Sequence, residues 1–381
     1  MKFDKTDLYY VNLGFQGKRL NLFEIAKWKN GLAFKNIEFA DSGVPIIKIA
    51  ELNNGINSKT SYTKNKYSDE VYLKNGDLIF SWSGNPETSI DIFKFNMSEG
   101  WLNQHIFKVT PNDSLVEKNF FYFLMKYLKP YFKKIASNKQ TTGLGHVTIS
   151  DLKRMSLNLP PLNTQKKIAA VLSALDDKIE LNNAINKNLE EQAQAIYKNM
   201  FPAVISNETS VGEYVIPKRG KSLSAKNAIR GDVPVVAGGL EPAFYHNSAN
   251  TKSPVITISA SGNAGYVRLW NIPVWSSDSS FIDSSITEDV YFWYVMLKLR
   301  QQEIFHLRTG TAQQHIYPKH IAQLPVKKLD EHRVTAFTER VTPLFSMMGA
   351  NTQENQKLGE LRDALLPRLM SGEIDVSAVE I

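Results

Sequence analysis

Polar side chains that could read nucleobases gather in two segments of the sequence. The first segment holds Lys139, Gln140, Thr141, Thr142 and His146, and the second holds Arg308, Thr309, Thr311, Gln313, Gln314 and His315. Arginine and lysine can donate to guanine, and glutamine can pair with adenine, when a loop carries them into a groove. The two segments share a frame but differ in side chains, which favours two loops that read different sequences. The alternative is that glycine and threonine only shape a turn whose polar groups face water.

Further candidates lie in two serine turns and at scattered basic positions. They are Ser81, Ser83 and Ser261 in or beside runs that end in Ser-Gly-Asn, and the basic residues Lys153, Arg154, Arg219, Lys221, Lys327 and Lys328. Such lysines and arginines could neutralise phosphates, which would orient a nucleic acid without reading its bases. His146 and His315 occupy corresponding positions, so a structural hydrogen bond inside the fold is an equal interpretation for them. Trp82 fits a core position better than a base-stacking platform.

These candidates lie in a sequence that repeats. The stretch around His146 recurs around His315, 169 positions later, and a helical segment follows each copy. Residues 76–85 match residues 254–263, and each run predicts a buried strand that closes in a turn. We therefore predict two mixed α/β halves. The helices expected inside them include residues 119–129 and 288–307.

Two long helical segments follow the two halves. Residues 164–201 contain no proline or glycine, and residues 331–369 have the more regular heptad pattern. Asn163 and Asp330 are the expected N-caps, and Gly372 is expected to end the second helix. We predict an antiparallel coiled coil of roughly 55 Å, longer than one turn of B-DNA at about 34 Å. Its predicted seam consists of Ile168, Leu172, Leu175, Ile179, Asn182, Leu189, Ile196, Val334, Phe337, Val341, Leu344, Met348, Asn351, Asn355, Leu358, Leu365 and Leu369.

Polar residues and a helix breaker interrupt this seam. Asn182, Asn351 and Asn355 fall in its middle, where buried amides lower stability but penalise slipped registers. Pro343 predicts a kink or a short break in the second helix. A solvated stretch, or a plain helical hairpin inside a larger core, is the alternative interpretation of the pair.

The expected fold class is therefore α+β. Two mixed α/β domains are separated by a pair of long antiparallel helices, with a pseudo-twofold internal repeat. The predicted ranges are 1–160 for the first domain, 161–202 for the central linking helix, 203–329 for the second domain, and 330–381 for the distal helix and C-terminal tail.

Composition narrows the class of protein. The chain has 381 residues, 43% of them hydrophobic, which suffices for two cores. It has no cysteine, no signal sequence and no long apolar run, so we expect a soluble cytoplasmic protein without a membrane association. The net charge of +7 favours a polyanionic partner.

Motifs for catalysis are not recognisable. Residues 158–161, Asn-Leu-Pro-Pro, resemble an adenine methyltransferase pocket but contain an extra leucine and lead into a helix. Gly220-Lys221-Ser222 imitates a phosphate loop, yet Gly212 lies eight residues upstream where the motif requires five. His315 and His320 have no cysteine or acidic cluster to complete a metal site. We expect no metal, no cofactor and no catalysis in this chain alone.

The order of the helical motifs resembles a known family. Pro160-Pro161-Leu162, the run from Gln165 to Leu181, Ala193–Tyr197 and the ending Leu361–Ile374 are similar to the specificity subunit of type I restriction-modification systems. The resemblance implies two target-recognition domains, each bound to half of a bipartite double-stranded DNA site. It also implies linking helices that set the spacer and dock methyltransferase (modification) subunits, expected to be two.

The same resemblance places the chemistry elsewhere. Restriction and translocase subunits would join through the complex, and S-adenosylmethionine, ATP and Mg²⁺ would belong to partner subunits that carry out DNA methylation and cleavage. Two departures put exact symmetry in doubt: residues 324–329 replace the Leu-Pro-Pro-Leu motif, and residues 1–19 have no counterpart in the second half. Residues 1–19 could form a loose arm or could close against the C-terminus.

Three other functions stay open at this stage. The chain could be a coiled-coil scaffold that binds only proteins, or a DNA-binding protein that ignores sequence. It could also be an enzyme with a novel site.

Overall fold

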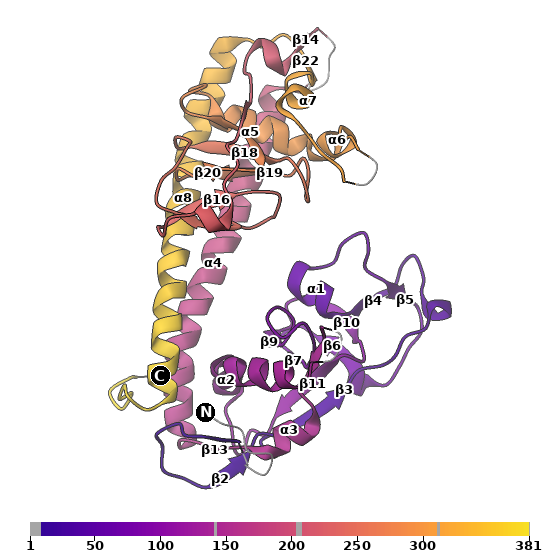
Figure 1. Cartoon of the computed structure of the whole chain (residues 1–381), viewed down its shortest axis with the longest axis vertical. Helices are drawn as coiled ribbons and strands as arrows, with labels where there is room; N and C mark the ends of the chain where they lie inside the picture. Colours follow the sequence, from indigo (N-terminus) through magenta and orange to yellow (C-terminus); the bar gives the residue numbers. More distant parts are fainter. Residues whose placement is uncertain (1–8, 141–142, 203–207, 311–312, 381) are drawn as a thin grey trace. The chain divides into compact units, whose positions relative to one another are not determined.

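The computed structural model describes residues 9–140, 143–202, 208–310 and 313–380 (Figure 1). The chain divides into two compact units. The first unit combines residues 1–177 with residues 358–381, and the second spans residues 178–357. Each unit contains one globular segment and part of both long helices. The predicted fold class is confirmed, since mixed α/β segments accompany a pair of long antiparallel helices.

In the first unit, two four-stranded sheets carry most of the globular segment, in the orders β3-β11-β7-β9 and β5-β4-β10-β6. The strands are β1 Tyr9–Val11, β2 Arg19–Asn21, β3 Ala26–Asn30, β4 Val44–Ile47, β5 Tyr62–Thr63, β6 Tyr72–Lys74, β7 Leu78–Ser81, β8 Ser83–Gly84, β9 Asp91–Lys94, β10 Glu99–Leu102, β11 Ile106–Pro111, β12 Gly145–His146 and β13 Met155–Asn158. The helices are α1 Ile49–Asn54, α2 Lys118–Asn138 and α3 Ile149–Arg154.

The second unit repeats this plan with a four-stranded sheet, in the order β15-β21-β18-β19, and a three-stranded sheet, in the order β17-β16-β20. The strands are β14 Thr209–Ser210, β15 Lys218–Arg219, β16 Val233–Val236, β17 Phe244–His246, β18 Val255–Ser259, β19 Val267–Trp270, β20 Trp275–Ser276, β21 Ser279–Asp283 and β22 Pro325–Val326, and the helices are α5 Val290–Leu299, α6 Gln301–His306 and α7 Pro318–Ala322.

One pairing makes the structural repeat explicit. In the first unit, β10 pairs in parallel with β4, and Trp101 lies opposite Ile46. In the second unit, β20 pairs in parallel with β16, and Trp275 lies opposite Val235. A parallel pair needs a long crossover connection, so its recurrence in both units is a strong sign of one duplicated topology.

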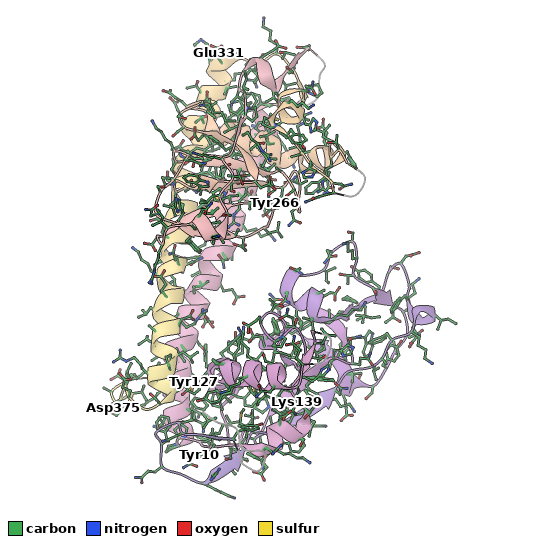
Figure 2. All side chains as sticks on the ribbon, in the orientation of Figure 1. Tyr10, Tyr127, Lys139, Tyr266, Glu331 and Asp375 are labelled. Carbon is green, nitrogen blue, oxygen red and sulfur yellow. The ribbon has the colours of Figure 1, made fainter. Side chains whose placement is uncertain are left out.

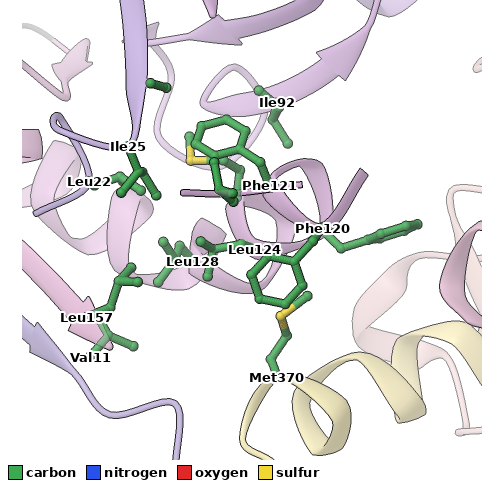
Figure 3. Packing of buried hydrophobic residues seen from close by; sticks show 14 of the residues in the cluster. Val11, Leu22, Ile25, Ile92, Phe120, Phe121, Leu124, Leu128, Leu157 and Met370 are labelled. Carbon is green, nitrogen blue, oxygen red and sulfur yellow. The ribbon is translucent and has the colours of Figure 1, made fainter. Parts of the chain in front are cut away.

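The core of the first unit joins its globular segment to the helix pair. Buried side chains of α2, among them Phe120 and Leu128, pack in one cluster with Val11, Leu157 and Met370. Figure 3 shows Met370, the last residue of the distal helix, beside Phe120. Residues near both ends of the sequence therefore complete one core.

The N-terminal segment closes against the C-terminal turn within this unit. Strand β1 pairs in parallel with β13, with Tyr9 opposite Met155. A Cβ atom on Gly14 would lie 2.0 Å from the carbonyl oxygen of Ser371, and Gly14 has a φ of 71°. Only glycine fits such a contact and conformation. Of the two possibilities for residues 1–19, closure holds for residues 9–19, and residues 1–8 lie outside the described part.

The linking helices are α4 Leu162–Met200 and α8 Glu331–Met370. Asn163 was the wrong N-cap for α4, because the helix already begins at Leu162. Asp330 does cap α8, since its Oδ1 accepts from the backbone nitrogen of His332 at 3.0 Å. Gly372 adopts a φ of 70° just beyond the end of α8, as expected of a helix-ending glycine.

A kink or a short break was predicted at Pro343, and the break is wrong, because α8 is one uninterrupted helix. Pro343 is exposed, while Val341 and Phe345 on either side are fully buried. Water can therefore satisfy the carbonyl that loses its partner, and the buried neighbours keep the helix in place.

Two other helix predictions also need correction. Helix α2 continues past Pro130 to Asn138 because Phe132 and Ile135 keep it buried. The single helix predicted over 288–307 is divided into α5 and α6 at Arg300. The buried Arg300 guanidinium donates to Pro325 O at 2.8 Å and to both Glu303 carboxylate oxygens at 2.6 Å.

Candidate nucleic-acid interface

Positive charge is concentrated in the globular segments. Residues 1–160 hold 22 Lys and Arg against 15 Asp and Glu, and residues 203–329 hold 13 against 9. The helical range 161–202 holds 5 against 5, and 330–381 holds 5 against 9. The net charge is thus +7 for residues 1–160 and +4 for residues 203–329. It is zero for residues 161–202 and −4 for residues 330–381. A polyanion would be attracted to the two globular segments and not to the helix pair.

In the first unit, the predicted loop residues meet the serine turn. Strand β12 pairs with β8, so that His146 lies opposite Ser83. The backbone nitrogen of Val147 donates to Trp82 O at 2.8 Å. Trp82 stacks on Phe107 with ring centroids 5.5 Å apart and tilts against His146 at 5.9 Å. The sequence prediction of a structural place for Trp82 agrees with this packing.

The serines at this position do not face solvent. Ser81 is 0% exposed and Ser83 is 5% exposed. A side chain inside the sheet cannot reach a DNA groove, so a base-reading role no longer fits either residue. Ser81 ends strand β7, and Ser83 belongs to the short strand β8 that pairs with His146.

Lys139 is held in an ion pair. Its Nζ lies 2.5 and 2.6 Å from the two carboxylate oxygens of Asp151, which is 1% exposed. Asp151 also accepts from the backbone nitrogen and the hydroxyl of Thr148, at 2.8 and 2.7 Å. Figure 2 labels Lys139, which follows α2. The ion pair fastens α3 to the end of α2, so Lys139 serves this link before any contact with DNA.

The remaining candidates of the first unit stand at its surface. Gln140 and Lys153 are exposed, and Arg154 is partly exposed. The Lys153 ammonium lies 4.8 Å from the ring centre of Phe23, and the Arg154 guanidinium lies 5.8 Å from that of Tyr9. Thr141 and Thr142 lie outside the described residues.

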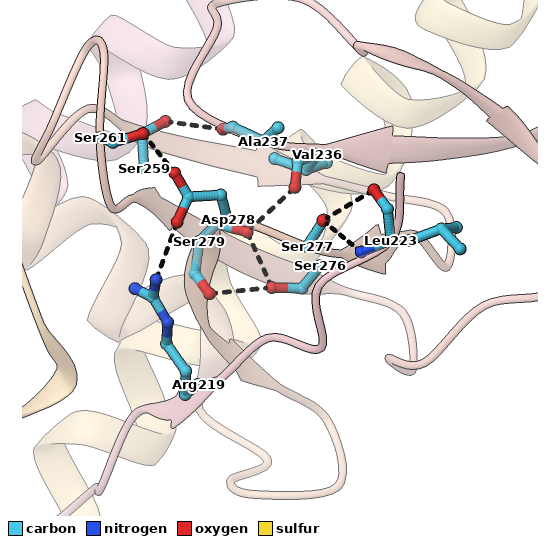
Figure 4. A network of polar contacts seen from close by, with 10 residues as sticks. All are labelled: Arg219, Leu223, Val236, Ala237, Ser259, Ser261, Ser276, Ser277, Asp278 and Ser279. Carbon is cyan, nitrogen blue, oxygen red and sulfur yellow. Dashed lines mark hydrogen bonds and ion pairs between the residues drawn. The ribbon is translucent and has the colours of Figure 1, made fainter. Parts of the chain in front are cut away.

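In the second unit, Arg219 and Ser261, from two of the predicted segments, both contact the Asp278 carboxylate (Figure 4). Arg219 Nη2 donates to Asp278 Oδ1 at 2.8 Å, and the Ser261 hydroxyl donates to Asp278 Oδ2. The Arg219 guanidinium also lies 5.7 Å from the ring centre of Tyr317, which stacks against His315. Strand β15, the turn after β18 and the loop before α7 therefore form one polar cluster.

Backbone hydrogen bonds hold the described residues of the second predicted loop, 308–310 and 313–317. Thr309 and His315 exchange backbone hydrogen bonds of 2.9 and 2.8 Å. The backbone nitrogen of Ile316 donates to Ala260 O at 3.0 Å, which is the counterpart of the bond from Val147 to Trp82. The two units thus hold equivalent loops in the same frame.

Side chains of this loop differ in their freedom. Arg308 donates to Ala264 O at 2.7 Å and to Gln314 Oε1 at 3.4 Å, and it lies 4.1 Å from the ring centre of Phe305. Gln313 and Gln314 are exposed. Thr311 lies outside the described residues.

Three predicted phosphate contacts have different settings. Lys221 is exposed, and its carbonyl accepts from Trp275 Nε1 at 2.8 Å. Lys327 and Lys328 line a cavity of about 150 Å³ together with Phe201 and Arg333, where the linking helices meet the second globular segment. Lys327 and Lys328 therefore lie just before the start of α8.

Sequence reasoning missed Asp151, Asp278 and Tyr317, the residues that hold the candidates in place. Asp278 is separated from Arg219 by 59 positions, whereas Asp151 is only 12 positions from Lys139. One available signal was the run Ser276-Ser277-Asp278-Ser279-Ser280. Serines on both sides of a single carboxylate are unusual within a strand region and indicate a hydrogen-bonded scaffold.

The predicted helix seam lies on the inner faces of α4 and α8. All its residues are buried or half-buried. In the second unit, Asn182, 1% exposed, donates to Asn355 Oδ1 at 2.9 Å and to Glu354 Oε2 at 2.7 Å. Asn351 donates to Asn186 Oδ1 at 2.9 Å. Partner numbers fall as α4 numbers rise, so the helices are antiparallel and the amides match in one register.

Electrostatics reinforce this amide group. The hydrogen bond from Asn182 lowers the pKa of the Glu354 carboxyl, and the Lys178 ammonium lowers it further. In the first unit, Arg362 and Asp176 make the corresponding bridge between the helices at 2.7 Å. Polar contacts therefore join the helices in both units.

Over the residues that the structure describes, no group of three or more His, Cys, Asp or Glu side chains could hold a metal ion. Within those ranges, no helix is both long and apolar enough to cross a membrane.

Comparisons with known proteins show which family this chain resembles. Residues 18–191 match the family described as Type I restriction modification DNA specificity domain. The match covers just under half of the chain, so this region is similar to that family. The resemblance to type I specificity subunits that the helical motifs predict is confirmed by this match.

Relatives extend the likeness over most of the chain. The specificity subunit of the type I restriction enzyme HindI from Haemophilus influenzae is 24% identical, over 79% of this chain and 87% of the relative. The MjaIX specificity subunit from Methanocaldococcus jannaschii is 26% identical, over 72% of this chain and 73% of the relative.

A solved structure supports the fold. The type I restriction-modification S subunit from M. genitalium matches with a TM-score of 0.55 and 17% identity, over 97% of this chain and 98% of that one. The fold described above is thus the fold of a known S subunit.

Proposed function

We propose that this chain is the noncatalytic DNA-recognition subunit of a type I restriction-modification enzyme, and that each globular segment reads one half of a split target. The observation that carries the proposal is the shared loop frame. The bonds from Val147 to Trp82 and from Ile316 to Ala260 hold equivalent loops in the two units, while the loop side chains differ. Two globular segments whose loops share a backbone arrangement but differ in side chains suit two half-sites of different sequence.

The charge distribution supports the same proposal. Positive charge on both globular segments would hold the phosphate backbone, while the helix pair is neutral to acidic. Exposed apolar side chains on the helices, Leu181, Met347 and Leu361, suit docking by methyltransferase subunits, of which we expect two. S-adenosylmethionine, ATP and Mg²⁺ would then act in the methyltransferase and translocase partners.

The test is methylation mapping with defined components. The chain is purified alone and together with a type I modification subunit from the same genome, and modified bases are mapped on genomic DNA. We expect no methyl transfer by the chain alone and transfer onto one split sequence by the complex. Methyl transfer by the chain alone would contradict a noncatalytic role.

Two alternative functions predict other results. A protein scaffold would bind no DNA even at low salt. A general DNA-packing protein would bind but would not distinguish sequences.

The helices are proposed to set the spacing between half-sites. Helix α4 has 39 residues and α8 has 40, which gives about 60 Å at roughly 1.5 Å per residue. Deleting one heptad from each helix shortens the pair by about 10 Å, or about three base pairs at roughly 3.4 Å each. The preferred spacer should shorten by that amount, and an unchanged spacer would mean that the helices do not set it.

A further inference from the structure

The backbone that carries Arg219 is fixed against the serine-rich segment. Gly220 follows it, and a Cβ atom at Gly220 would lie 2.5 Å from Ser276 O, so no larger residue fits there. The backbone nitrogen of Gly220 donates to Ser279 O at 2.8 Å, and that of Lys221 donates to Ser276 O at 2.9 Å. Arg219 therefore starts from a rigid point at the edge of the sheet.

The residues around Asp278 are fixed as well (Figure 4). The hydroxyls of Ser276 and Ser279 lie 2.8 Å apart, and Leu223 N donates to the Ser277 hydroxyl at 3.0 Å. Ser276, Ser277 and Ser279 are all buried. Buried hydroxyls that are fully bonded specify one backbone arrangement, so the Asp278 carboxylate has a defined position.

The guanidinium of Arg219 is held on two sides but is open on a third. Asp278 binds Nη2 and the ring of Tyr317 lies 5.7 Å away. Within the described ranges, Nε and Nη1 of Arg219 have no hydrogen-bond partner. The Arg219 side chain is 41% exposed. A planar group with fixed orientation and free donors thus faces solvent.

We propose that Arg219 reads a guanine in the half-site bound by the second globular segment, with Asp278 and Tyr317 as positioning residues. This inference rests on the proposed function and replaces the phosphate contact expected from the sequence. Guanine presents O6 and N7 in the major groove, which matches two parallel donors of a guanidinium. A phosphate contact needs only a charge, whereas base reading needs the fixed direction that Asp278 supplies.

The experiment measures sequence preference with the chain bound to its modification subunit and a randomised split-target library. Arg219→Lys keeps the charge but removes the planar fork. We expect the preference for guanine at one position to fall roughly 10- to 100-fold. The other half-site should stay unchanged, because it is read by the other globular segment.

Asp278→Asn tests positioning and not only charge. It should weaken the preference at the same base position as Arg219→Lys, and the double variant should lose no more than Arg219→Lys alone, because both act on one contact. Tyr317→Phe keeps the ring and should preserve the preference. A merely structural role for Asp278 would instead change overall affinity without singling out one base.

Lys221→Ala is the matched control, since Lys221 is exposed and lies two positions away. It should weaken binding to all sequences alike. Circular dichroism should show all these variants folded, because every substituted side chain reaches solvent.

The outcomes separate the inference from the proposed function. If the complex that contains the chain without substitutions selects no sequence, the proposed function is wrong. If it selects a split sequence and Arg219→Lys leaves that preference intact, or weakens all sequences equally, the guanine contact is wrong.

Discussion

The two globular segments share a topology but carry their positive charge on different side chains. Residues 1–160 contain 20 lysines and 2 arginines, whereas residues 203–329 contain 8 lysines and 5 arginines. Lysine is a flexible point charge, and arginine is a planar group with directed donors. Under the proposed function, we expect the first segment to depend more on phosphate contacts and the second more on directed contacts to bases.

Equivalent positions in the two units also have different physical roles. The third residue of α3 is Asp151, and the third residue of α7 is His320, which accepts from the backbone nitrogen of Tyr317 at 3.3 Å. In the first unit the carboxylate is buried and binds Lys139. In the second unit the predicted site residue Arg219 pairs instead with Asp278, which is 38% exposed and belongs to a different segment. The acidic partner of a predicted basic residue is therefore buried in the first unit and exposed in the second.

The largest expected effect concerns the buried carboxylate. Asp151→Ala should lower the free energy of unfolding by about 3 kcal/mol, because it removes a helix cap and leaves Lys139 without its partner. Asp278→Asn should cost less than about 1 kcal/mol, because that pair is exposed. Urea denaturation with hydrogen exchange of residues 118–158 measures the first effect. If both substitutions lowered the free energy of unfolding equally, the difference proposed between the two carboxylates would be wrong.

Trp82 should matter for stability more than for DNA recognition. Trp82→Ala removes the stack on Phe107 and the hydrogen bond to Asn30 Oδ1 at 3.1 Å, which should cost about 2 kcal/mol in unfolding. His105→Ala is the control, because the His105 ring also contacts Trp82 but is exposed. A loss of DNA affinity without loss of stability would instead make Trp82 a base platform.

Salt dependence should distinguish the lysine-rich segment. Lys153→Ala should weaken binding to all sequences alike and reduce the slope of log affinity against log salt by about 0.9, as expected for one lost phosphate contact. Lys187→Ala on α4 is the control, since that side chain is 79% exposed and lies on the near-neutral helix. An unchanged slope for Lys153→Ala would remove this residue from the interface.

The smallest effect is a pH dependence confined to the second unit. Burial, and then the Lys319 charge, lower the pKa of His320 below its usual 6.5. The folded state therefore binds fewer protons than the unfolded state, and stability should fall as the pH drops below about 6.5. His320→Gln should flatten this change in melting temperature between pH 7 and pH 5.5. A melting temperature that rises on acidification would contradict the sign.

Much of the fold could be predicted because the sequence carries local signals for it. The long helices appear as heptads bounded by breakers, and their observed limits lie within two residues of those predicted. The failures at Pro130 and Pro343 have one cause. Burial on both sides of an exposed proline outweighs the lost hydrogen bond, and burial is a tertiary property that a local pattern does not contain.

The candidate site was less predictable. Side-chain chemistry singled out Arg219 and Ser261, but the carboxylate that joins them lies 59 and 17 positions away from them. Ser81 and Ser83 were chosen for their turn, and the sheet buries them. Residue type predicts which groups could bind DNA, whereas exposure and partners depend on the packing of distant segments.

The first unit is discontinuous in sequence, and this has a consequence for its synthesis. Leu369, Met370 and Val376 complete the core around α2, and Lys167 Nζ donates to Ser377 O at 2.5 Å. At about 5 to 20 residues per second, a ribosome needs roughly 10 to 40 s to pass from residue 177 to residue 376. During that interval the apolar face of the nascent first unit has no native cover, so chaperone capture should be strongest there.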